Sequence, residues 1–338
     1  MRFPEFSGEW DEYAIGEILS IGNGRDYKHL HNGDIPVFGT GGYMTSVDDF
    51  LYDGESVFVG RKGTINKPLY YNGKFWTVDT LFYTYNFTDV LPKFVYCLFQ
   101  TINWLKYNEA SGVPSLSKAT IEKIKVRIPS MDEQDKLSNL LFLLDKRIEV
   151  QNKIIEKLET LIKGIIETVI SLQKPNTSIK DCLECNSSIL QESQVAEYGA
   201  SPVYGATGIT GYTEAADVNG ESILIIKDGS GVGTVKYVTG EYSYIGTLNR
   251  LIAKDGYYLK YIYFALQGFS FEPYKTGMAI PHIYFKDYGK AKIFCPTIEK
   301  QSAIAQKLSS TEDKVSVEKQ ILFYYQVQKS YLLSQMLI

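Results

Sequence analysis

The sequence predicts two tandem α+β domains, each followed by a long helix, with the two helices forming an antiparallel coiled coil of pseudo-two-fold symmetry. Two observations predict this fold. The chain repeats itself in order at a register of about 167 residues, far longer than the period of a solenoid. After each copy, the hydrophobic pattern changes from period two to a heptad, which is typical of a coiled-coil helix. The predicted parts are a first α+β domain at 1–130, a central helix at 131–173, a second α+β domain at 174–297 and a C-terminal helix at 298–338.

The internal repeat consists of short matches that keep the same order in both copies. Chance does not preserve such an order over a whole chain, so the two copies are expected to share one fold. The matched segments are 36–39 with 202–205, 54–56 with 220–222, 63–64 with 233–234, 80–81 with 247–248, 94–96 with 261–263, 111–114 with 276–281 and 128–134 with 295–301.

Each copy combines strands with a helix. Short β-rich runs, such as 56–59 and 222–226, are separated by glycine and asparagine, as strands and turns require. A helix is expected later in each copy, and a final strand is stopped by a proline. These elements are the helices at 94–105 and 259–266, and the strands at 124–128 before Pro129 and 291–294 before Pro296.

The helix after each proline carries apolar residues at alternating spacings of three and four. A helix of about 38 residues is roughly 57 Å long, more than one small domain can cover, so the two helices are expected to pack against each other. In the first helix the seam extends from Leu137 to Val169. Its central residues are Leu144, Ile148, Gln151, Ile155 and Leu158 in the first helix and Val315, Glu318, Leu322 and Tyr325 in the second.

One polar residue lies near the middle of each seam, Gln151 in the first helix and Glu318 in the second. A buried polar residue often fixes the register of a coiled coil, so we predict that these two are neighbours. The alternative is a solvated turn on an imperfect seam. Four further apolar residues lie off the seam and fit either a partner-binding face or a wider core: Leu140, Ile154, Leu161 and Ile321.

Composition places the chain among globular proteins, with 44% hydrophobic residues and no apolar run near the roughly 20 residues of a membrane span. The first residues do not resemble a signal peptide, so a cytoplasmic protein without membrane contact is expected. The four cysteines are too few and too scattered for a disulfide framework, and we expect free thiols. Cys182 and Cys185 have the spacing of half a zinc site, but no second pair follows, so no metal is expected.

The charge is the main argument against a chain that binds DNA unaided. The formal net charge is −4. Residues 1–130 carry 13 basic and 15 acidic groups, and residues 175–297 carry 10 and 12. Nucleic-acid binders usually present a basic face to the phosphates. If this chain reads DNA, partners must supply much of the phosphate affinity.

Several segments resemble the specificity subunit of type I restriction-modification enzymes, in which a target-recognition domain and a conserved helix occur twice. The resemblance rests on ordered duplication across essentially the whole chain, since each piece alone is weakly specific. The segments of the first copy are Pro-Val-Phe-Gly-Thr-Gly-Gly at 36–42, Gly-Arg-Lys-Gly-Thr at 60–64, Phe-Trp-Thr-Val-Asp-Thr at 75–80, Ser-Gly-Val-Pro-Ser-Leu at 111–116, and Ile128-Pro129 with Glu133-Gln134.

The resemblance implies a bipartite, asymmetric target in double-stranded DNA, with the helices setting the gap between the half-sites. It also implies two methyltransferase subunits, which use S-adenosylmethionine, and restriction subunits, which use ATP and Mg²⁺. The second copy departs from the first, because 60–63 becomes Lys-Asp-Gly-Ser-Gly at 227–231 and Glu133 becomes Lys300. The two domains are therefore expected to read different half-sites.

Polar residues on glycine-rich loops are the candidate DNA contacts, because base edges are read by donors and acceptors held on tight turns. Arg61 is the favoured reader of a guanine, against the alternative of a surface or phosphate contact. Lys62, Lys67 and Lys227 are expected on phosphates. The full set is Thr40, Gly41, Tyr43, Arg61, Lys62, Thr64, Lys67, Ser111 and Ser115 in the first domain, and Thr207, Lys227, Ser230, Thr234, Thr276 and His282 in the second.

No catalytic constellation is recognisable in the sequence. It contains no Asn-Pro-Pro-Tyr or Asp-Pro-Pro-Tyr methylation motif and no Gly-Lys-Ser/Thr phosphate loop. The only Glu-x-Lys, at Glu312–Lys314, lies in the expected second helix. A non-catalytic chain without a cofactor of its own is therefore expected, and methylation and cleavage are assigned to partners.

Two other functions remain open at this point. The chain could serve a type IIB system, in which one fused restriction-methyltransferase chain replaces the separate partners. It could also be a coiled-coil adaptor with two protein-binding domains, which the acidic charge favours.

Overall fold

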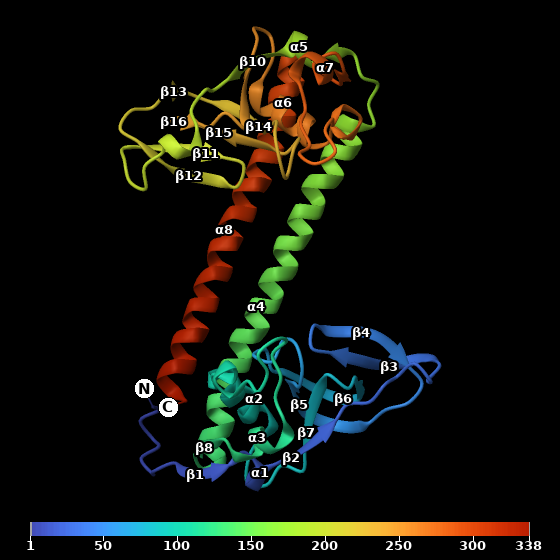
Figure 1. The fold of residues 1–338 in the computed structure, drawn as a ribbon, viewed down its shortest axis with the longest axis vertical. Coiled ribbons are helices and arrows are strands. Elements are labelled where there is room, and N and C mark those ends of the chain that lie inside the picture. Colours follow the sequence, from blue (N-terminus) through green and yellow to red (C-terminus); the bar gives the residue numbers. More distant parts are fainter. Residues whose placement is uncertain (1, 338) are drawn as a thin grey trace. The chain divides into compact units, whose positions relative to one another are not determined.

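A computed structural model describes residues 2–337 of the chain, which divides into two compact units. The first unit comprises Met1–Asn152 and Gln320–Ile338, and the second comprises Lys153–Lys319. Helix α4 covers Met131–Ile165 and helix α8 covers Ile298–Met336 (Figure 1). Each long helix therefore contributes one part to each unit.

A six-stranded mixed sheet forms the centre of the first unit, in the order β2-β7-β5-β6-β3-β4. Its β-branched and aromatic residues suit a pleated surface that is buried on one face. Neighbouring strands are antiparallel except β3 and β6, which run parallel with Val37 opposite Trp76. A separate antiparallel pair, β1 with β8, precedes α4. The strands are β1 Asp11–Ala14, β2 Ser20–Asn23, β3 Asn32–Gly39, β4 Gly42–Val47, β5 Tyr52–Gly60, β6 Leu69–Thr77, β7 Leu81–Tyr85 and β8 Lys125–Ile128.

Helix α2 supplies much of the core of the first unit. A proline at its first turn is compatible with the helix start, where the amide has no helical partner. Phe94, Val95 and Phe99 of α2 are fully buried, and Leu141 of α4 and Met336 of α8 join the same cluster. The helices before α4 are α1 Ile15–Ile18, α2 Pro92–Thr101, the 3-10 helix η1 Trp104–Tyr107 and α3 Lys118–Lys123.

The second unit contains two four-stranded sheets, in the orders β10-β17-β14-β15 and β12-β11-β16-β13, and the pair β18-β9. Helix α6 packs in its core, which also takes in Leu308 of α8. The strands are β9 Thr177–Ser178, β10 Leu183–Ser187, β11 Ser201–Gly205, β12 Gly208–Thr213, β13 Val218–Asn219, β14 Ser222–Ile226, β15 Val235–Val238, β16 Glu241–Tyr244, β17 Leu248–Ala253 and β18 Lys292–Ile293. The short helices are α5 Ile179–Cys182, η3 Glu192–Gln194, α6 Leu259–Gln267, η4 Glu272–Tyr274 and α7 Phe285–Tyr288.

The two units repeat one topology, as the internal duplication predicted. The parallel pair β3–β6 recurs as β11–β16, where Val203 lies opposite Ser243. The long strand β5 corresponds to β13 and β14 together, and β6 corresponds to β15 and β16. The break lies at Gly220 and Gly240, which are joined by a backbone hydrogen bond of 3.0 Å. Strands β5 and β6 continue through the equivalent Gly54 and Gly73, which also have positive φ, so the first unit has one sheet where the second has two.

A buried glutamine joins each long helix to the α+β domain that precedes it. Gln134 Oε1 accepts the amide of Leu91 at 2.8 Å, and its Nε2 donates to the carbonyl of Pro129 at 2.9 Å. In the second unit, Gln301 accepts the amide of Tyr258 at 3.0 Å and donates to the carbonyl of Pro296 at 2.8 Å. In both units the glutamine links the first turn of the long helix to the residue before α2 or α6 and to the proline that precedes the long helix. A mixed α+β domain therefore leads directly into each long helix.

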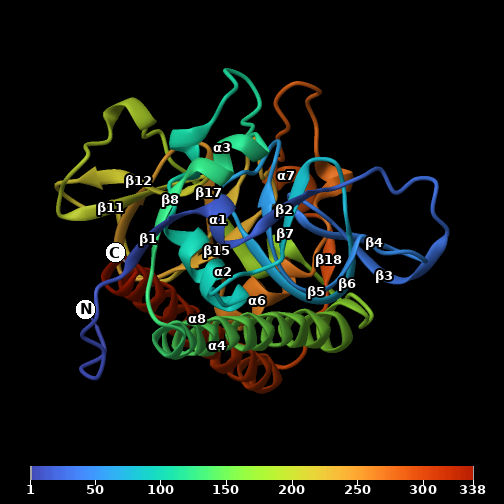
Figure 2. The same cartoon turned by 90° about the horizontal axis from the view of Figure 1, so that it is seen from below.

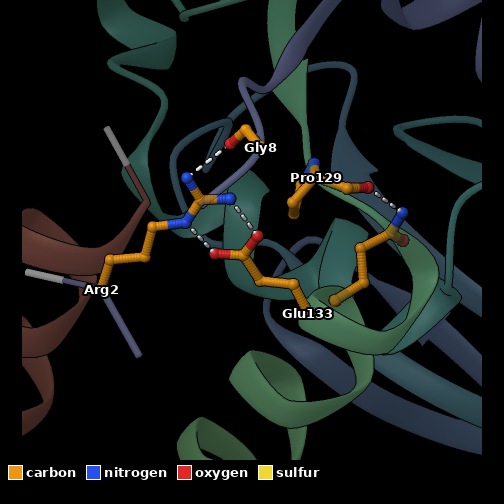
Figure 3. A network of polar contacts seen from close by, with 5 residues as sticks. Arg2, Gly8, Pro129 and Glu133 are labelled. Atoms are coloured by element: carbon orange, nitrogen blue, oxygen red, sulfur yellow. Dashed lines mark hydrogen bonds and ion pairs between the residues drawn. The ribbon is translucent and has the colours of Figure 1, made fainter. Parts of the chain in front are cut away.

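Beside Gln134, the neighbouring Glu133 is held by the N-terminal segment. Figure 3 shows the Arg2 guanidinium lying against the Glu133 carboxylate, with two hydrogen bonds of 2.7 and 2.6 Å. Arg2 also donates to the carbonyl of Gly8. The Glu133 side chain is only 1% exposed, whereas Lys300 at the equivalent position is exposed. The first unit thus has an N-terminal clamp where the second has a solvated lysine.

Within each unit, the parts of α4 and α8 pack side by side and antiparallel. In the first unit Arg147 of α4 lies over the Tyr325 ring of α8. Lys329, one turn further along α8, pairs with Asp145, which comes earlier on α4, so the two helices run in opposite directions. In the second unit Lys319 pairs with Glu159 at 2.6 Å. Gln151 is buried and Glu318 is half-buried. Because Gln151 and Glu318 fall in different units, their proximity stays a prediction.

The end of the first long helix departs from the heptad pattern. After Ile165 the chain continues as a π-helix, η2, over Ile166–Ser171. The wider turn of the π-helix changes which side chains point toward the core of the second unit. Ile166 and Ile170 are buried there, whereas Val169 is 38% exposed. Placing Val169 on the seam was therefore wrong.

Candidate nucleic-acid interface

In the first unit, the β5–β6 loop is fixed between a turn and another loop by backbone hydrogen bonds. The Arg61 amide donates to Thr80 of the β6–β7 turn at 2.8 Å, and the Arg61 carbonyl accepts the amide of Leu116 at 2.9 Å. The Gly63 amide donates to Pro114 of the η1–α3 loop at 2.8 Å. These bonds bring the predicted contacts at 61–64 and 111–115 together on one edge of the domain.

The second unit builds the same arrangement from its own residues. The Lys227 amide donates to Thr247 of the β16–β17 turn at 3.0 Å, and the Lys227 carbonyl accepts the amide of Ile283 at 2.9 Å. The Gly229 amide donates to Pro281 of the η4–α7 loop at 2.9 Å. The backbone frame of the interface is therefore duplicated bond by bond.

This frame corrects one pairing of the sequence repeat. Gly63 was matched with Gly233, but Gly229 makes the equivalent bond to a proline carbonyl. The β5–β6 loop at 61–68 and the β14–β15 loop at 227–234 are equally long, so Gly63 and Gly229 occupy the same position in each loop. Both Gly63 and Gly229 have φ near +90°, a conformation that favours glycine.

The tip of a β-hairpin borders this loop in each unit. In the first unit, Thr40 Oγ1 lies 3.6 Å from the position that a Cβ at Gly63 would occupy. In the second unit, Thr207 of the β11–β12 tip and Thr234 of the β14–β15 loop line one hollow of about 140 Å³. The predicted hairpin residues and loop residues are thus neighbours.

Arg61 is the most prominent cation at the first interface. Its side chain is exposed, its Nη1 donates to the carbonyl of Asp79 at 3.3 Å, and its guanidinium lies 5.9 Å from the centre of the Phe82 ring. These contacts orient the guanidinium, which has five N–H donors, and leave most of them available. Lys62 and Thr64 are exposed beside it.

The second interface places different groups on the same frame. Lys227 is half-buried, and Asp228 forms a β-bridge with His282. The His282 ring lies edge-on to Tyr284, with ring centres 5.0 Å apart, and its Nδ1 is 3.3 Å from the carbonyl oxygen of Ile280. Lys227 and Asp228 therefore stand where the first unit has Arg61 and Lys62, and His282 stands where it has Ser115.

The remaining candidates lie at the margins of the two interfaces. Tyr43 is exposed, and its hydroxyl is 3.1 Å from Ser46 Oγ. Lys67 is exposed and makes no hydrogen bond or ion pair with any residue between 2 and 337 that the structure describes. The other predicted residues are exposed or half-buried on the loops described above: Gly41, Ser111, Ser115, Ser230 and Thr276.

Sequence reasoning missed residues that build the frame and its surface. Thr80 and Thr247 were seen as a repeat match, which was the signal for their role, but not as parts of the interface. Pro114 and Pro281 had the same signal. The exposed aliphatic residues of these loops, Val113, Met278 and Ile280, carried no signal, because apolar residues are ordinarily expected in a core.

Comparison with protein families and solved structures assigns the chain to a class. The family model described as type I restriction modification DNA specificity domain matches twice, at residues 7–160 and 176–323. The chain belongs to the type I restriction-modification DNA specificity family. It is a DNA specificity chain.

Two solved structures share the fold of the specificity chain. The crystal structure of a type I restriction-modification S subunit from M. genitalium has a TM-score of 0.77 at 17% identity, with 98% of each chain covered. A chain from a structure on complex assembly and conformational transition of the type I R-M system has a TM-score of 0.55 at 12% identity, also with 98% of each chain covered. None of the curated proteins matches the sequence.

The cysteines of the specificity chain fill apolar positions. Cys182 and Cys295 lie with their sulfur atoms 3.7 Å apart and are buried, and burial raises the pKa of the Cys185 thiol to about 11. Across residues 2–337, no cluster of three or more His, Cys, Asp or Glu is placed to hold a metal ion. No helix in that range is long and apolar enough to cross a membrane.

Proposed function

We propose that the specificity chain reads a bipartite, asymmetric DNA target, with one half-site per unit, as a non-catalytic subunit. The observation that carries this proposal is the duplicated frame with unlike side chains. Arg61 and Lys227 have equivalent backbone bonds to Thr80 and Thr247, so the two interfaces present different chemistry from the same geometry. Different donors at the same place favour different bases.

At the first half-site, Arg61 is the proposed reader of guanine. A guanidinium donates two parallel hydrogen bonds to guanine O6 and N7, a contact worth about 1–3 kcal/mol of discrimination. The bond to Asp79 and the Phe82 ring hold the side chain in one orientation, which reduces the entropy lost on binding. Thr40, Gly41, Tyr43, Thr64, Ser111 and Ser115 complete this half of the interface.

At the second half-site, His282, Thr207, Ser230, Thr234 and Thr276 are the proposed polar contacts, with Lys227 on a phosphate. Asp228 favours a cytosine amino group at its edge, since a carboxylate accepts from N4. In the first unit, Lys62 and Lys67 are assigned to phosphates. Because the net charge of the chain is −4, the partners supply most of the remaining phosphate affinity.

The proposed partners are two methyltransferase subunits that bind S-adenosylmethionine, joined for cleavage by restriction subunits that bind ATP and Mg²⁺. Helix α8 offers a docking surface in the first unit. Phe323, Val327 and Tyr331 are spaced four residues apart and are 60%, 49% and 53% exposed. An exposed apolar stripe of this kind is typical of a helix that receives another helix.

The stripe on α8 differs from the one that the sequence suggested. Leu140 packs against the core of the first unit, and Ile154 and Ile321 are half-buried. Leu161, at 51% exposure, is the only member of that set with an exposed side chain. The proposed docking surface is therefore Phe323, Val327 and Tyr331, and Leu161 is not part of it.

The long helices are the proposed ruler for the gap between half-sites. One heptad inserted into α4 after Val150, with a matching heptad after Val317 of α8, adds about 10 Å to a helix pair and keeps the seam in phase. The gap in the recognised sequence is expected to change or the activity to be lost. Methylation of the original sequence with an unaltered gap would reject the ruler.

Selection from a random duplex pool followed by an electrophoretic shift tests the proposal. The chain is assayed with and without a methyltransferase encoded beside it, and a bipartite sequence with a fixed gap is expected. A third assay adds a fused restriction-methyltransferase chain. Sequence selection in that assay alone would favour a type IIB system, whereas no sequence-specific binding in any of the three assays would favour a coiled-coil adaptor.

A further inference from the structure

The η4–α7 loop, which borders the interface of the second unit, carries an apolar tip. In the η4–α7 loop, Met278 is fully exposed and Ile280 is 66% exposed. The base of the loop is rigid, because Thr276 and His282 exchange two backbone hydrogen bonds of 2.9 and 2.8 Å. The tip is therefore presented on a fixed stem, and Figure 2 shows this orange loop projecting beyond α7.

The first unit has a smaller version of the same feature. Val113, in the η1–α3 loop, is 56% exposed and directly precedes Pro114. Ile280 directly precedes Pro281, and both prolines accept the amide of the interface glycine, Gly63 or Gly229. An exposed branched aliphatic residue thus recurs at one position of a frame whose other side chains differ.

The surroundings of the tip favour an anionic partner such as DNA over a cationic one. The segment 276–282 contains no carboxylate, and the nearby Glu272 of η4 is paired with Lys275, which directly follows that helix. The Lys227 carbonyl is bonded to Ile283 at the end of the loop, so the apolar tip and the cation share one edge. Proteins that deform DNA insert Ile, Met or Pro between base pairs while cations hold the backbone.

We propose that Met278 and Ile280 enter the DNA at the second half-site and wedge open one base step, whereas Val113 only contacts base edges at the first. This inference rests on the proposed function. The difference follows from side-chain length: Met and Ile reach into a base step, while Val extends by a single branched carbon. A wedge adds specificity, because some base steps unstack more readily than others.

The test uses the full chain, with its methyltransferase if that is required for binding, and the duplex selected above. 2-Aminopurine is placed at each step of both half-sites in turn. The wild type is expected to raise fluorescence severalfold at one step of the second half-site. The double variant Met278→Ser/Ile280→Ser is expected to lose this signal and to bind about tenfold more weakly. Ile280→Leu is expected to keep both.

Val317→Ser is the matched control, because Val317 is an exposed aliphatic residue of the same unit that lies on α8. Double-variant binding and fluorescence equal to those of the wild type would overturn the wedge and leave the proposed function intact. Replacing thymine by deoxyuridine removes the thymine methyl group from the duplex. If this weakens wild-type binding and 2-aminopurine shows no fluorescence change at any step, the wedge is overturned in favour of a contact with that methyl group. If the wild type selects no sequence, the proposed function and the wedge fail together.

Discussion

Arg61 in the first unit and Lys227 in the second make the same two backbone hydrogen bonds, yet their side chains meet different surroundings. Arg61 is exposed and oriented by Asp79, whereas Lys227 is half-buried beside a bridge between Asp228 and His282. The backbone geometry has been kept and the side chains have diverged. The backbone frame that positions a contact and the side chain that makes the contact can therefore vary independently.

The contacts between the long helices and the recognition domains also keep one partner and vary the other. Asp145 and Glu312 are equivalent, but their cations come from different elements. Lys329 of α8 pairs with Asp145 and donates to Gln100 at 2.6 Å in the first unit. Lys260 of α6 pairs with Glu312 at 3.0 Å in the second. The equivalent of Lys260, Lys93, lies instead over the Phe142 ring.

The largest expected effect concerns the buried glutamine at the start of each long helix, which the two units share. Gln134→Leu and Gln301→Leu each leave a helix-start amide and a proline carbonyl without their partner, at a cost of about 3 kcal/mol in the free energy of unfolding. Urea unfolding monitored by hydrogen exchange measures the loss unit by unit. Gln306→Leu is the control, since Gln306 is exposed. Unequal losses in the two units would show that the frames are not equivalent.

A smaller effect is expected where the units differ. Arg61→Ala should weaken specific binding by about 1–3 kcal/mol and relax one position of the first half-site, because the guanine contact is lost. Selection from a random pool with the variant measures both. The second half-site should be unchanged. Relaxation at the second half-site would contradict separate reading.

The ion pairs give a third comparison. Lys329→Met should destabilise the first unit by about 1–2 kcal/mol, because Asp145 is then left partly buried without a cation. Lys93→Met should change little there, whereas Lys260→Met should destabilise the second unit. Thermal unfolding of the three variants ranks them. An equal effect of Lys93→Met and Lys329→Met would refute the assignment of the cations.

The smallest effect concerns phosphates. Lys67→Ala should lower the slope of log affinity against log salt by about 1 without changing the sequence selected. Lys146→Ala, on the exposed face of α4, is the control. Binding titrations at several salt concentrations give the slope. A change in selected sequence would make Lys67 a base reader instead.

The duplication was sufficient to predict the fold class and to identify the loops that form each interface. Ordered matches such as 80–81 with 247–248 mark structurally equivalent turns, because a repeated topology needs the same turns at the same places. The heptad predicted long helices that pair, since period and spacing are local properties of the chain.

Three features were beyond the sequence pattern. The equivalence of Gly63 and Gly229 depends on a carbonyl that is distant in sequence. The shift from Val169 to Ile166 and Ile170 arises from a π-helix, and all three residues are apolar, so the pattern fits either register. The exposure of Val113 and Ile280 depends on how far their loops project from the core, which composition does not encode.

Exchange of residues 1–130 for the same segment of a homologue with a different target tests directly whether each unit reads its own half-site. The hybrid chain is assembled with its methyltransferase, and the methylated sequence is determined. Separate readers on equivalent frames predict a change in one half-site, with the other half-site and the gap retained. A change in both half-sites would contradict the account.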